Sequence, residues 1–209
     1  MIDLYTWTTP NGRKASIMLE EVGLPYTVNA VNITEGEQFD PEFLKISPNN
    51  KIPAIVDQDN GVTMMQSGAI LLYLADKTGK LMPKDGRASW QVMEWLMWQM
   101  GELGPMLGQA HHFLKFNKGK SAYAEERYGK EAKRLYGVLD KRLAEHEFIV
   151  DEYSVADIAA WPWISRYEWH GIDIEAFPNV KRWYVAIASR PAVQKGYHVP
   201  KKMNEIPMP

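Results

Sequence analysis

The chain of 209 residues contains no cysteine. This absence excludes disulfide bonds, thiolate metal sites and any nucleophile made from a thiol of the protein itself. A chain without cysteine also fits the reducing cytoplasm, where disulfides do not persist. We therefore expect a cytoplasmic protein, and we expect any sulfur chemistry it performs to use sulfur from a ligand.

An excess of positive charge and a long hydrophobic run are missing as well. The 24 Lys and Arg residues are balanced by 26 Asp and Glu residues, for a formal net charge of -2. No global positive field therefore attracts nucleic acid or anionic membranes. The start, "MIDLYTW", lacks the basic and apolar regions of a signal peptide, and no apolar run reaches the length of about 20 residues that crosses a bilayer. We expect no nucleic-acid or membrane partner.

What the chain does contain is ample material for a core. Hydrophobic residues make up 45% of the sequence, with 8 tryptophans and 11 methionines. The length suits one large domain or two small ones. The methionines and tryptophans predict a substantial core and an adaptable apolar pocket.

The first eighty residues alternate short apolar runs with helical patterns. Glycines follow both helical patterns, at positions where a helix ends readily. Strands are predicted at residues 1–5, 26–31, 53–57 and 62–65, and helices at residues 11–23 and 67–78. This order predicts an α/β unit built on a small mixed sheet.

After residue 85 the strand patterns disappear. Residues 87–116 read as one long helical region, apolar on nearly all sides, which predicts a central helix buried on several faces. Gly104-Pro105 is expected to kink it, because proline removes a backbone hydrogen bond. Residues 122–145 predict a charged amphipathic helix, and residues 81–88 a linker between the two halves.

The motif "TTPNG", residues 8–12, places a turn directly before a helix. A helix N-terminus carries unsatisfied N–H groups and a partial positive charge, so a thiol held there loses its proton more easily. The side chains of Thr9 and Asn11 can both donate hydrogen bonds toward the same point. The alternative is an ordinary turn and helix cap, because Thr, Pro, Asn and Gly are all turn residues.

Two further motifs offer contacts for a peptide ligand. In "NNKIPAIVD" a cis Ile52-Pro53 bond would turn the backbone of Ile52 outward to pair with an extended peptide, whereas a trans bond would only begin a strand. In "QSGAILLYLADKTG" Ser67 is predicted to be the helix N-cap, where the N–H groups can hold a carboxylate and Gln66 an amino group. An ordinary capped core helix is the alternative.

These three motifs occur in the order seen in the cytosolic glutathione transferases, which the chain resembles over essentially its full length. The resemblance implies a thioredoxin-like α/β domain at residues 1–80, an all-helical domain at residues 87–209, a homodimer and a cis Ile52-Pro53 bond. "YSVADIAAWPW" is similar to the family's helix-capping element, in which Ser154 faces Asp157 as a capping box. "TPNG", "ISPNNKIPAIVD", "LGPMLGQAHHF" and "ERY" most resemble the bacterial Nu class, the glutathione-dependent disulfide reductase type, and its fungal relatives.

The resemblance also implies roles for individual residues. Thr9 and Asn11 match positions that face the glutathione sulfur and are the expected catalytic residues, with Tyr5 as the rival candidate. The expected glutathione-binding residues are Asn11, Gln38 near the glycine end, the backbone of Ile52, Gln66 and Ser67 at the γ-glutamyl group, and Arg127 from a helix. Gln66 departs from the glutamate that the Nu class often has, so one charged contact is lost.

Other polar and aromatic residues are expected to be structural. His111 and His112 are adjacent on a helix and point in different directions, so they form a poor metal pair, and no metal site is predicted. Trp90, Trp95 and Trp98 are most simply core residues, although a floor for an apolar substrate is an alternative.

The sequence therefore predicts an enzyme that makes the thiol of glutathione anionic and uses it as cosubstrate. The expected activity is reduction of small disulfides, with lower conjugating and peroxidase activities. Two alternatives remain open: a protein of the same fold that binds glutathione or apolar ligands without turnover, and a purely structural domain that binds no glutathione.

Overall fold

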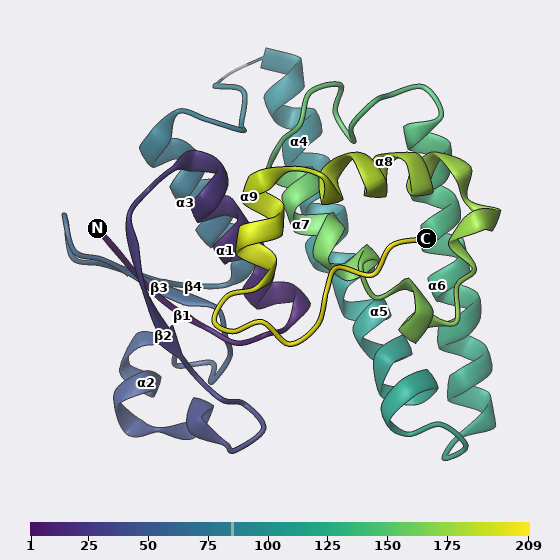
Figure 1. Cartoon of the computed structure of the whole chain (residues 1–209), viewed down its shortest axis with the longest axis horizontal. Coiled ribbons are helices and arrows are strands. Elements are labelled where there is room, and N and C mark those ends of the chain that lie inside the picture. Colours follow the sequence, from purple (N-terminus) through teal and green to yellow (C-terminus); the bar gives the residue numbers. More distant parts are fainter. Residues whose placement is uncertain (85) are drawn as a thin grey trace. The chain divides into compact units, whose positions relative to one another are not determined.

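The computed structural model describes residues 1–84 and 86–209; Asp85, inside the predicted linker, lies outside the described residues. The chain divides into two compact units, whose helices and strands are labelled in Figure 1. Unit 1 comprises residues 1–82 and 189–206, and unit 2 comprises residues 83–188 and 207–209. Among the described residues, no helix combines the length and the apolar character that crossing a membrane requires.

Unit 1 contains a mixed sheet of four strands in the order β2-β1-β3-β4. The strands are β1 (Ile2–Thr6), β2 (Tyr26–Ala30), β3 (Ala54–Asp57) and β4 (Val62–Met65). β1 pairs with β2 in parallel and with β3 in antiparallel orientation, and β3 pairs with β4 antiparallel. In β1 the side chains of Ile2, Leu4 and Thr6 are buried and those between are partly exposed, as the period of two requires.

Helices pack on this sheet and on one another. They are α1 (Pro10–Val22), α2 (Pro41–Ile46), α3 (Ser67–Thr78) and α9 (Pro191–Tyr197), together with a short 3-10 helix, Glu37–Phe39. α1 ends at Gly23 and α3 at Gly79, and both glycines adopt the left-handed conformation with φ of 74° and 66°. The predicted thioredoxin-like α/β arrangement is confirmed.

α1 is buried over most of its length because α3 and α9 both pack against it. The guanidinium of Arg13 lies 3.5 Å from the centre of the Tyr197 ring, and its Nε donates to the Tyr197 carbonyl oxygen at 3.1 Å. α1, the helix that begins at the "TTPNG" turn, is therefore held from both sides.

Unit 2 is helical. Its α-helices are α4 (Gly86–Trp98), α5 (Gly104–Ala110), α6 (Ala122–Leu143), α7 (Val155–Ile164) and α8 (Pro178–Ala188). A π-helical turn, Gln99–Leu103, lies between α4 and α5, and Pro105 falls in the first turn of α5. The helical type therefore changes at the place where the sequence predicts a kink. A second π-helical segment, His111–Phe116, follows α5.

α4 is less buried than its apolar composition predicts. Only Val92 and Leu96 are buried on this helix, whereas Trp90 is 74% and Met97 49% exposed. The prediction that Trp90 is a core residue, on a helix buried on several faces, is therefore wrong within a single chain. The apolar composition of a helix predicts that one of its faces is buried, but it does not predict whether the burying partner belongs to the same chain.

The capping box at the start of α7 is confirmed. The Ser154 hydroxyl accepts from the Ala156 N–H at 3.3 Å, and Asp157 Oδ2 accepts from the Ser154 N–H at 3.0 Å. Asp157 Oδ1 also accepts from the Ile149 N–H at 3.0 Å and from Trp183 Nε1 at 2.8 Å. Asp157 is fully buried and serves the structure of unit 2.

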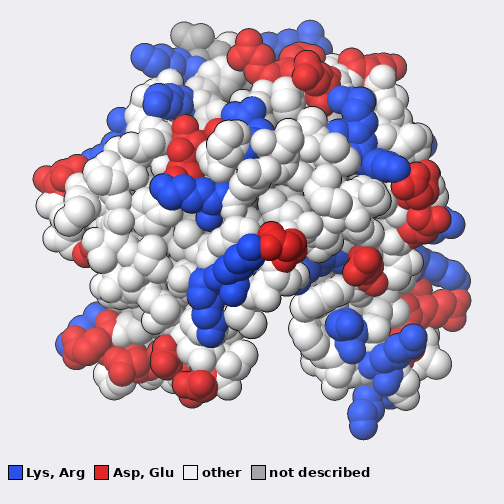
Figure 2. All heavy atoms as spheres, in the orientation of Figure 1, with Lys and Arg blue, Asp and Glu red and all other residues white. Residues whose placement is uncertain are grey.

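Charges of both signs are interspersed on the face of the molecule drawn in Figure 2. Blue lysine and arginine side chains alternate there with red acidic ones, and no large area of one sign is visible. This distribution agrees with the small net charge of the sequence.

Candidate functional site

The "TTPNG" turn forms the N-terminus of α1. Thr9 is the N-cap, with an extended backbone (φ -110°, ψ 162°), and its side chain accepts from the Gly12 N–H at 3.1 Å. Pro10 is the first helical residue, and the first turn contains no acidic side chain. The partial positive charge of the helix end is therefore not neutralised from within the turn.

Thr9 and Asn11 lie in the same helical turn, as predicted. The Thr9 hydroxyl accepts the capping bond and still has its own hydrogen to donate. Asn11 is partly exposed, one residue after Pro10. Two side chains that can donate are thus combined with a helix N-terminus, an arrangement suited to an anion such as a thiolate.

Gly12 fixes the geometry of this turn. A Cβ atom at this position would lie 2.2 Å from the Trp7 carbonyl oxygen and 2.5 Å from Thr6 Oγ1. The backbone of α1 can approach the end of β1 this closely only because residue 12 has no side chain.

Tyr5 belongs to a small apolar cluster and not to the turn. Its side chain packs against the buried residues Val31, Phe43 and Ala54, with its ring centre 6.1 Å from that of Phe43. Burial, with a further contribution from Asp3, raises the pKa of the Tyr5 hydroxyl above its ordinary value. These features suit a packing role better than activation of a thiol.

The Ile52-Pro53 bond is cis, which confirms the expectation taken from the resemblance. Ile52 lies just before β3, with its side chain partly buried against the cluster around Phe43. Within residues 1–84 and 86–209, neither the N–H nor the C=O of Ile52 has a hydrogen-bond partner. Both groups can therefore pair with the backbone of an extended peptide.

α3 begins at Ser67, the first residue of the predicted helix, but its N-cap differs by one residue from the prediction. The helix begins at Ser67, so Gln66 and not Ser67 occupies the N-cap position, and no side chain caps the helix. Gln66 is exposed and has a positive φ of 73°, an unfavourable conformation for a residue with a side chain. The uncapped N–H groups of this turn can bind a carboxylate.

Ser67 is 4% exposed, and its hydroxyl oxygen accepts from Lys14 Nζ at 3.3 Å. Lys14 is a residue that the motif analysis missed. Its place four residues before Met18, on the apolar side of the predicted helix, was a signal that could have singled it out.

Gln38 lies in the 3-10 helix Glu37–Phe39. Its Oε1 atom is buried and has no hydrogen-bond partner among the residues that the structure describes. A buried amide oxygen without a partner is costly, so it suits an acceptor that a ligand N–H completes. The contact of Gln38 with a peptide ligand stays a prediction.

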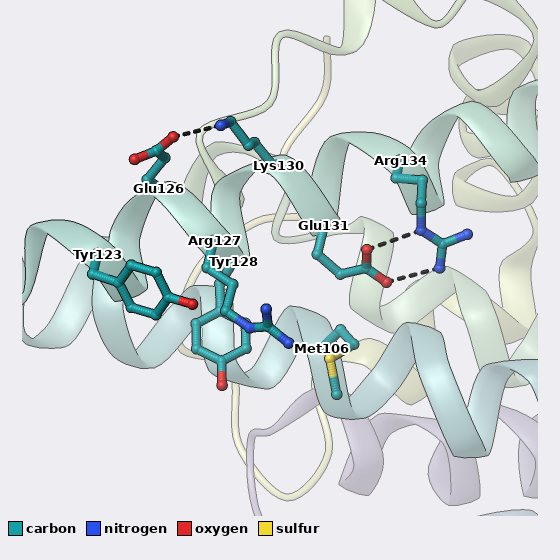
Figure 3. A pocket seen from close by; sticks show the side chains of 8 residues that line it. All are labelled: Met106, Tyr123, Glu126, Arg127, Tyr128, Lys130, Glu131 and Arg134. Carbon is teal, nitrogen blue, oxygen red and sulfur yellow. Dashed lines mark hydrogen bonds and ion pairs between the residues drawn. The ribbon is translucent and has the colours of Figure 1, made fainter.

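Arg127 lies on α6 in unit 2, in the wall of a cavity of about 580 Å³ between α5 and α6. Figure 3 shows it beside Tyr128 and Met106, while Glu126 pairs with Lys130 and Glu131 with Arg134. Among the described residues, no hydrogen bond or ion pair engages the exposed guanidinium of Arg127. Arg127 can therefore receive an anion.

His111 is a packing residue. Its ring stacks on that of His170 with centres 4.5 Å apart and on that of Trp163 with centres 5.4 Å apart. Burial is the main reason that the pKa of His111 falls to about 4, so the ring is neutral at pH 7. His112, its neighbour, is exposed.

Family models match both the first and the second half of the chain. Residues 1–76 match the family model described as glutathione S-transferase, N-terminal domain, and residues 103–191 match glutathione S-transferase, C-terminal domain. The chain is 50% identical to the disulfide-bond oxidoreductase YfcG of Escherichia coli, over 92% of this chain and 92% of that protein.

The chain is also similar to solved structures over nearly its full length. A glutathione transferase from Burkholderia graminis, crystallised with two glutathione molecules per subunit, has a TM-score of 0.91 and 45% identity, covering 97% of this chain and 89% of that one. A glutathione transferase from Pseudomonas putida, crystallised with one glutathione disulfide per subunit, has a TM-score of 0.90 and 42% identity, covering 95% and 91%.

Proposed function

Because the chain belongs to the glutathione S-transferase family, we propose that it binds glutathione in unit 1, makes the ligand's thiol anionic and uses the thiolate to reduce small disulfides. The observation that carries this proposal is the N-terminus of α1, where Thr9 and Asn11 share a turn with no acidic side chain. The nucleophile comes from the ligand, since the chain has no cysteine.

The remaining contacts of unit 1 fit the tripeptide. The free N–H and C=O of Ile52 pair with its cysteinyl part, and Gln38 accepts from the glycine end. Gln66 and Ser67, at the uncapped N-terminus of α3, hold the γ-glutamyl group. For function we propose the boundaries predicted from the sequence, with residues 1–80 binding glutathione and residues 87–209 forming the helical domain. These boundaries differ from the two compact units, because residues 189–206 belong to unit 1.

Lowering the thiol pKa is the main catalytic effect. A free thiol with a pKa of about 8.5 is only about 3% ionised at pH 7. A decrease of about two pKa units makes the thiolate the major form and corresponds to about 2.7 kcal/mol of differential stabilisation. One helix N-terminus and two hydrogen-bond donors are sufficient for an effect of this size.

Reduction of a disulfide by this site needs two glutathione molecules. The first thiolate attacks one sulfur of the substrate, forms a mixed disulfide and releases the other sulfur as a thiol after protonation. The second glutathione thiolate attacks the mixed disulfide, which releases the remaining substrate thiol and forms glutathione disulfide. The substrate gains two electrons, and two glutathiones are oxidised.

A thiolate can attack a carbon, a peroxide or a disulfide, and the similar proteins favour the disulfide as the substrate. The Escherichia coli relative is named a disulfide-bond oxidoreductase, and the two similar crystal structures contain two glutathiones or one glutathione disulfide per subunit. Arg127, at its cavity with Tyr123 and Tyr128, offers a positive charge for a second anionic ligand, within its own subunit or across a dimer. Conjugating and peroxidase activities are expected to be lower.

We also propose a homodimer. Trp90 and Met97 lie seven residues apart on α4, hence on the same helical face, and both are largely exposed. Exposed large apolar residues on one face mark an interaction surface. A cytoplasmic location stays a prediction that rests on the absence of cysteine.

The class of reaction is tested by comparing substrates. With glutathione as reductant, we expect kcat/KM for hydroxyethyl disulfide to exceed that for conjugation of a chloronitrobenzene. Asn11→Ala is expected to lower kcat/KM for the disulfide by about ten- to a hundredfold, because one donor to the thiolate is lost. Its thermal unfolding is expected to be close to that of the unaltered protein.

Two results would contradict this assignment. If conjugation outpaced disulfide reduction, the chain would not be a disulfide reductase. If glutathione bound tightly and no carbon, peroxide or disulfide substrate turned over, the protein would be a binding module of the same fold. An unchanged rate in Asn11→Ala would remove this residue from the mechanism.

A further inference from the structure

The segment that follows α9, residues 198–206, belongs to unit 1 and contacts the residue just before the "TTPNG" turn. The Nζ atom of the exposed Lys201 lies 4.4 Å from the centre of the Trp7 ring. A cation over the face of a tryptophan is attracted by the electrons of the ring. In Figure 1 this yellow segment passes the turn that joins β1 to α1.

Trp7 is part of the backbone that shapes the candidate thiolate site. Its carbonyl oxygen accepts from the Thr9 N–H at 2.7 Å, and the same oxygen is the atom that a Cβ at Gly12 would meet at 2.2 Å. The ring on which Lys201 lies therefore belongs to a residue that is tied directly to the N-cap of α1. Lys201 adds a positive charge beside this turn.

The charge of Lys201 is not balanced by a carboxylate. Its neighbour Lys202 pairs with Glu205, which also lies 3.9 Å from His198. Burial is the main reason that the pKa of His198 falls below its ordinary value, so this ring is neutral at pH 7. Within residues 1–84 and 86–209, no ion pair engages Lys201, and the first turn of α1 contains no acidic side chain.

Lys201 lies on the flank of α1 that the proposed glutathione contacts do not use. The backbone of Ile52, just before β3, and Gln66 and Ser67, at the start of α3, are the proposed contacts for the tripeptide. α3 and α9 both pack on α1, and Figure 1 draws them on opposite flanks of it. Because residues 198–206 follow α9, Lys201 approaches the turn from the flank where a second molecule can meet the thiolate.

We propose that Lys201 is a specificity-determining residue that favours disulfide substrates with a carboxylate a few bonds from the attacked sulfur. The inference rests on the proposed function, because it needs a glutathione thiolate at the N-terminus of α1. It goes beyond that function, since it states which class of disulfide the site prefers. The attraction is between the Lys201 ammonium group and the substrate carboxylate.

The reaction itself is the exchange described above. The glutathione thiolate forms a bond to one sulfur of the substrate while the bond between the two substrate sulfurs breaks. The electron pair of the broken bond leaves on the other sulfur, which takes a proton from water, and a second glutathione thiolate reduces the mixed disulfide. A carboxylate on the substrate would repel the attacking thiolate, and a nearby cation offsets this repulsion.

The test compares three disulfides of similar length and different charge, with glutathione as reductant. Dithiodipropionate carries two carboxylates, hydroxyethyl disulfide is neutral, and cystamine carries two ammonium groups. In Lys201→Met, the ratio of kcat/KM for dithiodipropionate to that for hydroxyethyl disulfide is expected to fall about fivefold at low ionic strength. The same ratio for cystamine is expected to rise. Intrinsic reactivity cancels, because each ratio is compared with that of the unaltered protein.

Two variants serve as controls. Lys201→Arg keeps the charge and can still lie on the Trp7 ring, so it is expected to keep the ratios of the unaltered protein. Lys80→Met removes the same charge from unit 1 at the far end of α1, where Lys80 Nζ donates to the Val22 carbonyl oxygen. It is also expected to keep the ratios.

Unchanged ratios in Lys201→Met, or an equal change in Lys80→Met, would overturn the role of Lys201 and leave the proposed function standing. A loss of the preference in Lys201→Arg would also overturn it, because charge would not be the cause. No turnover of hydroxyethyl disulfide by the unaltered protein would overturn the proposed function and this inference with it.

A measurement on the unaltered protein does not depend on the folding of any variant. Salt screens the attraction between exposed charges, so the ratio of kcat/KM for dithiodipropionate to that for hydroxyethyl disulfide is expected to fall between about 20 mM and about 0.5 M sodium chloride. A ratio that does not change with salt would overturn the inference.

Discussion

Asp157→Ala is expected to lower the free energy of unfolding of the protein by about 3–5 kcal/mol. The Asp157 side chain is fully buried and accepts from the N–H groups of Ser154 and Ile149 and from Trp183 Nε1. Alanine would leave these donors buried without an acceptor and remove the capping box of α7. Guanidinium unfolding followed by circular dichroism measures the change.

The charge of Asp157 depends on the pH at which the unfolding is measured. Burial raises the pKa of Asp157 to about 6, so the side chain is the carboxylate above about pH 7, where the measurement belongs. Asp173→Ala is the matched control. Asp173 is an exposed N-cap, and within the described part of the chain its Oδ1 accepts only from the Glu175 N–H, at 3.1 Å. It is expected to cost about 1 kcal/mol. An equal cost for the two variants would contradict the structural role assigned to Asp157.

Gly12→Ala is expected to lower kcat/KM for disulfide reduction by about a hundredfold or more. Its Cβ would lie 2.2 Å from the Trp7 carbonyl oxygen, a distance that no Cβ atom tolerates, so the turn that carries Thr9 and Asn11 must shift. Displacement of both donors from the sulfur would remove most of the stabilisation of the thiolate. Steady-state kinetics with glutathione and hydroxyethyl disulfide checks this.

Gly137→Ala provides the comparison for Gly12→Ala. Gly137 lies inside α6, and a Cβ there would meet no atom within 4 Å. This variant is expected to keep its activity and to gain up to about 1 kcal/mol of stability, because alanine favours the helix over glycine. Retention of wild-type kcat/KM by Gly12→Ala would show that the position of this turn does not control catalysis.

Local patterns were enough to predict the elements that position the site. The strand and helix order of the first eighty residues and the capping box of Ser154 and Asp157 all depend on residues close together in sequence. The cis bond at Ile52-Pro53 could not be derived in this way, since local chemistry favours trans, and only the resemblance to a family predicted it.

Features that depend on distant contacts were not predictable from the pattern. The contact of Arg13 with Tyr197 joins residues 184 apart, and the burial of Lys14 depends on packing by α3 and α9. The exposure of Trp90 depends on what covers α4, which periodicity does not specify. The N-cap of α3 is Gln66 and not the predicted Ser67, and the positive φ of Gln66 just before the helix is not visible in the local pattern.

The proposed mechanism requires that the N-terminus of α1 makes a ligand thiol anionic. The direct measurement is the ultraviolet absorbance of the thiolate of glutathione bound to the unaltered protein, followed as the pH is varied. We expect an apparent pKa of about 6.5 for the bound thiol, about two units below that of the free thiol. A bound thiol that titrates at about 8.5, as in solution, would contradict it.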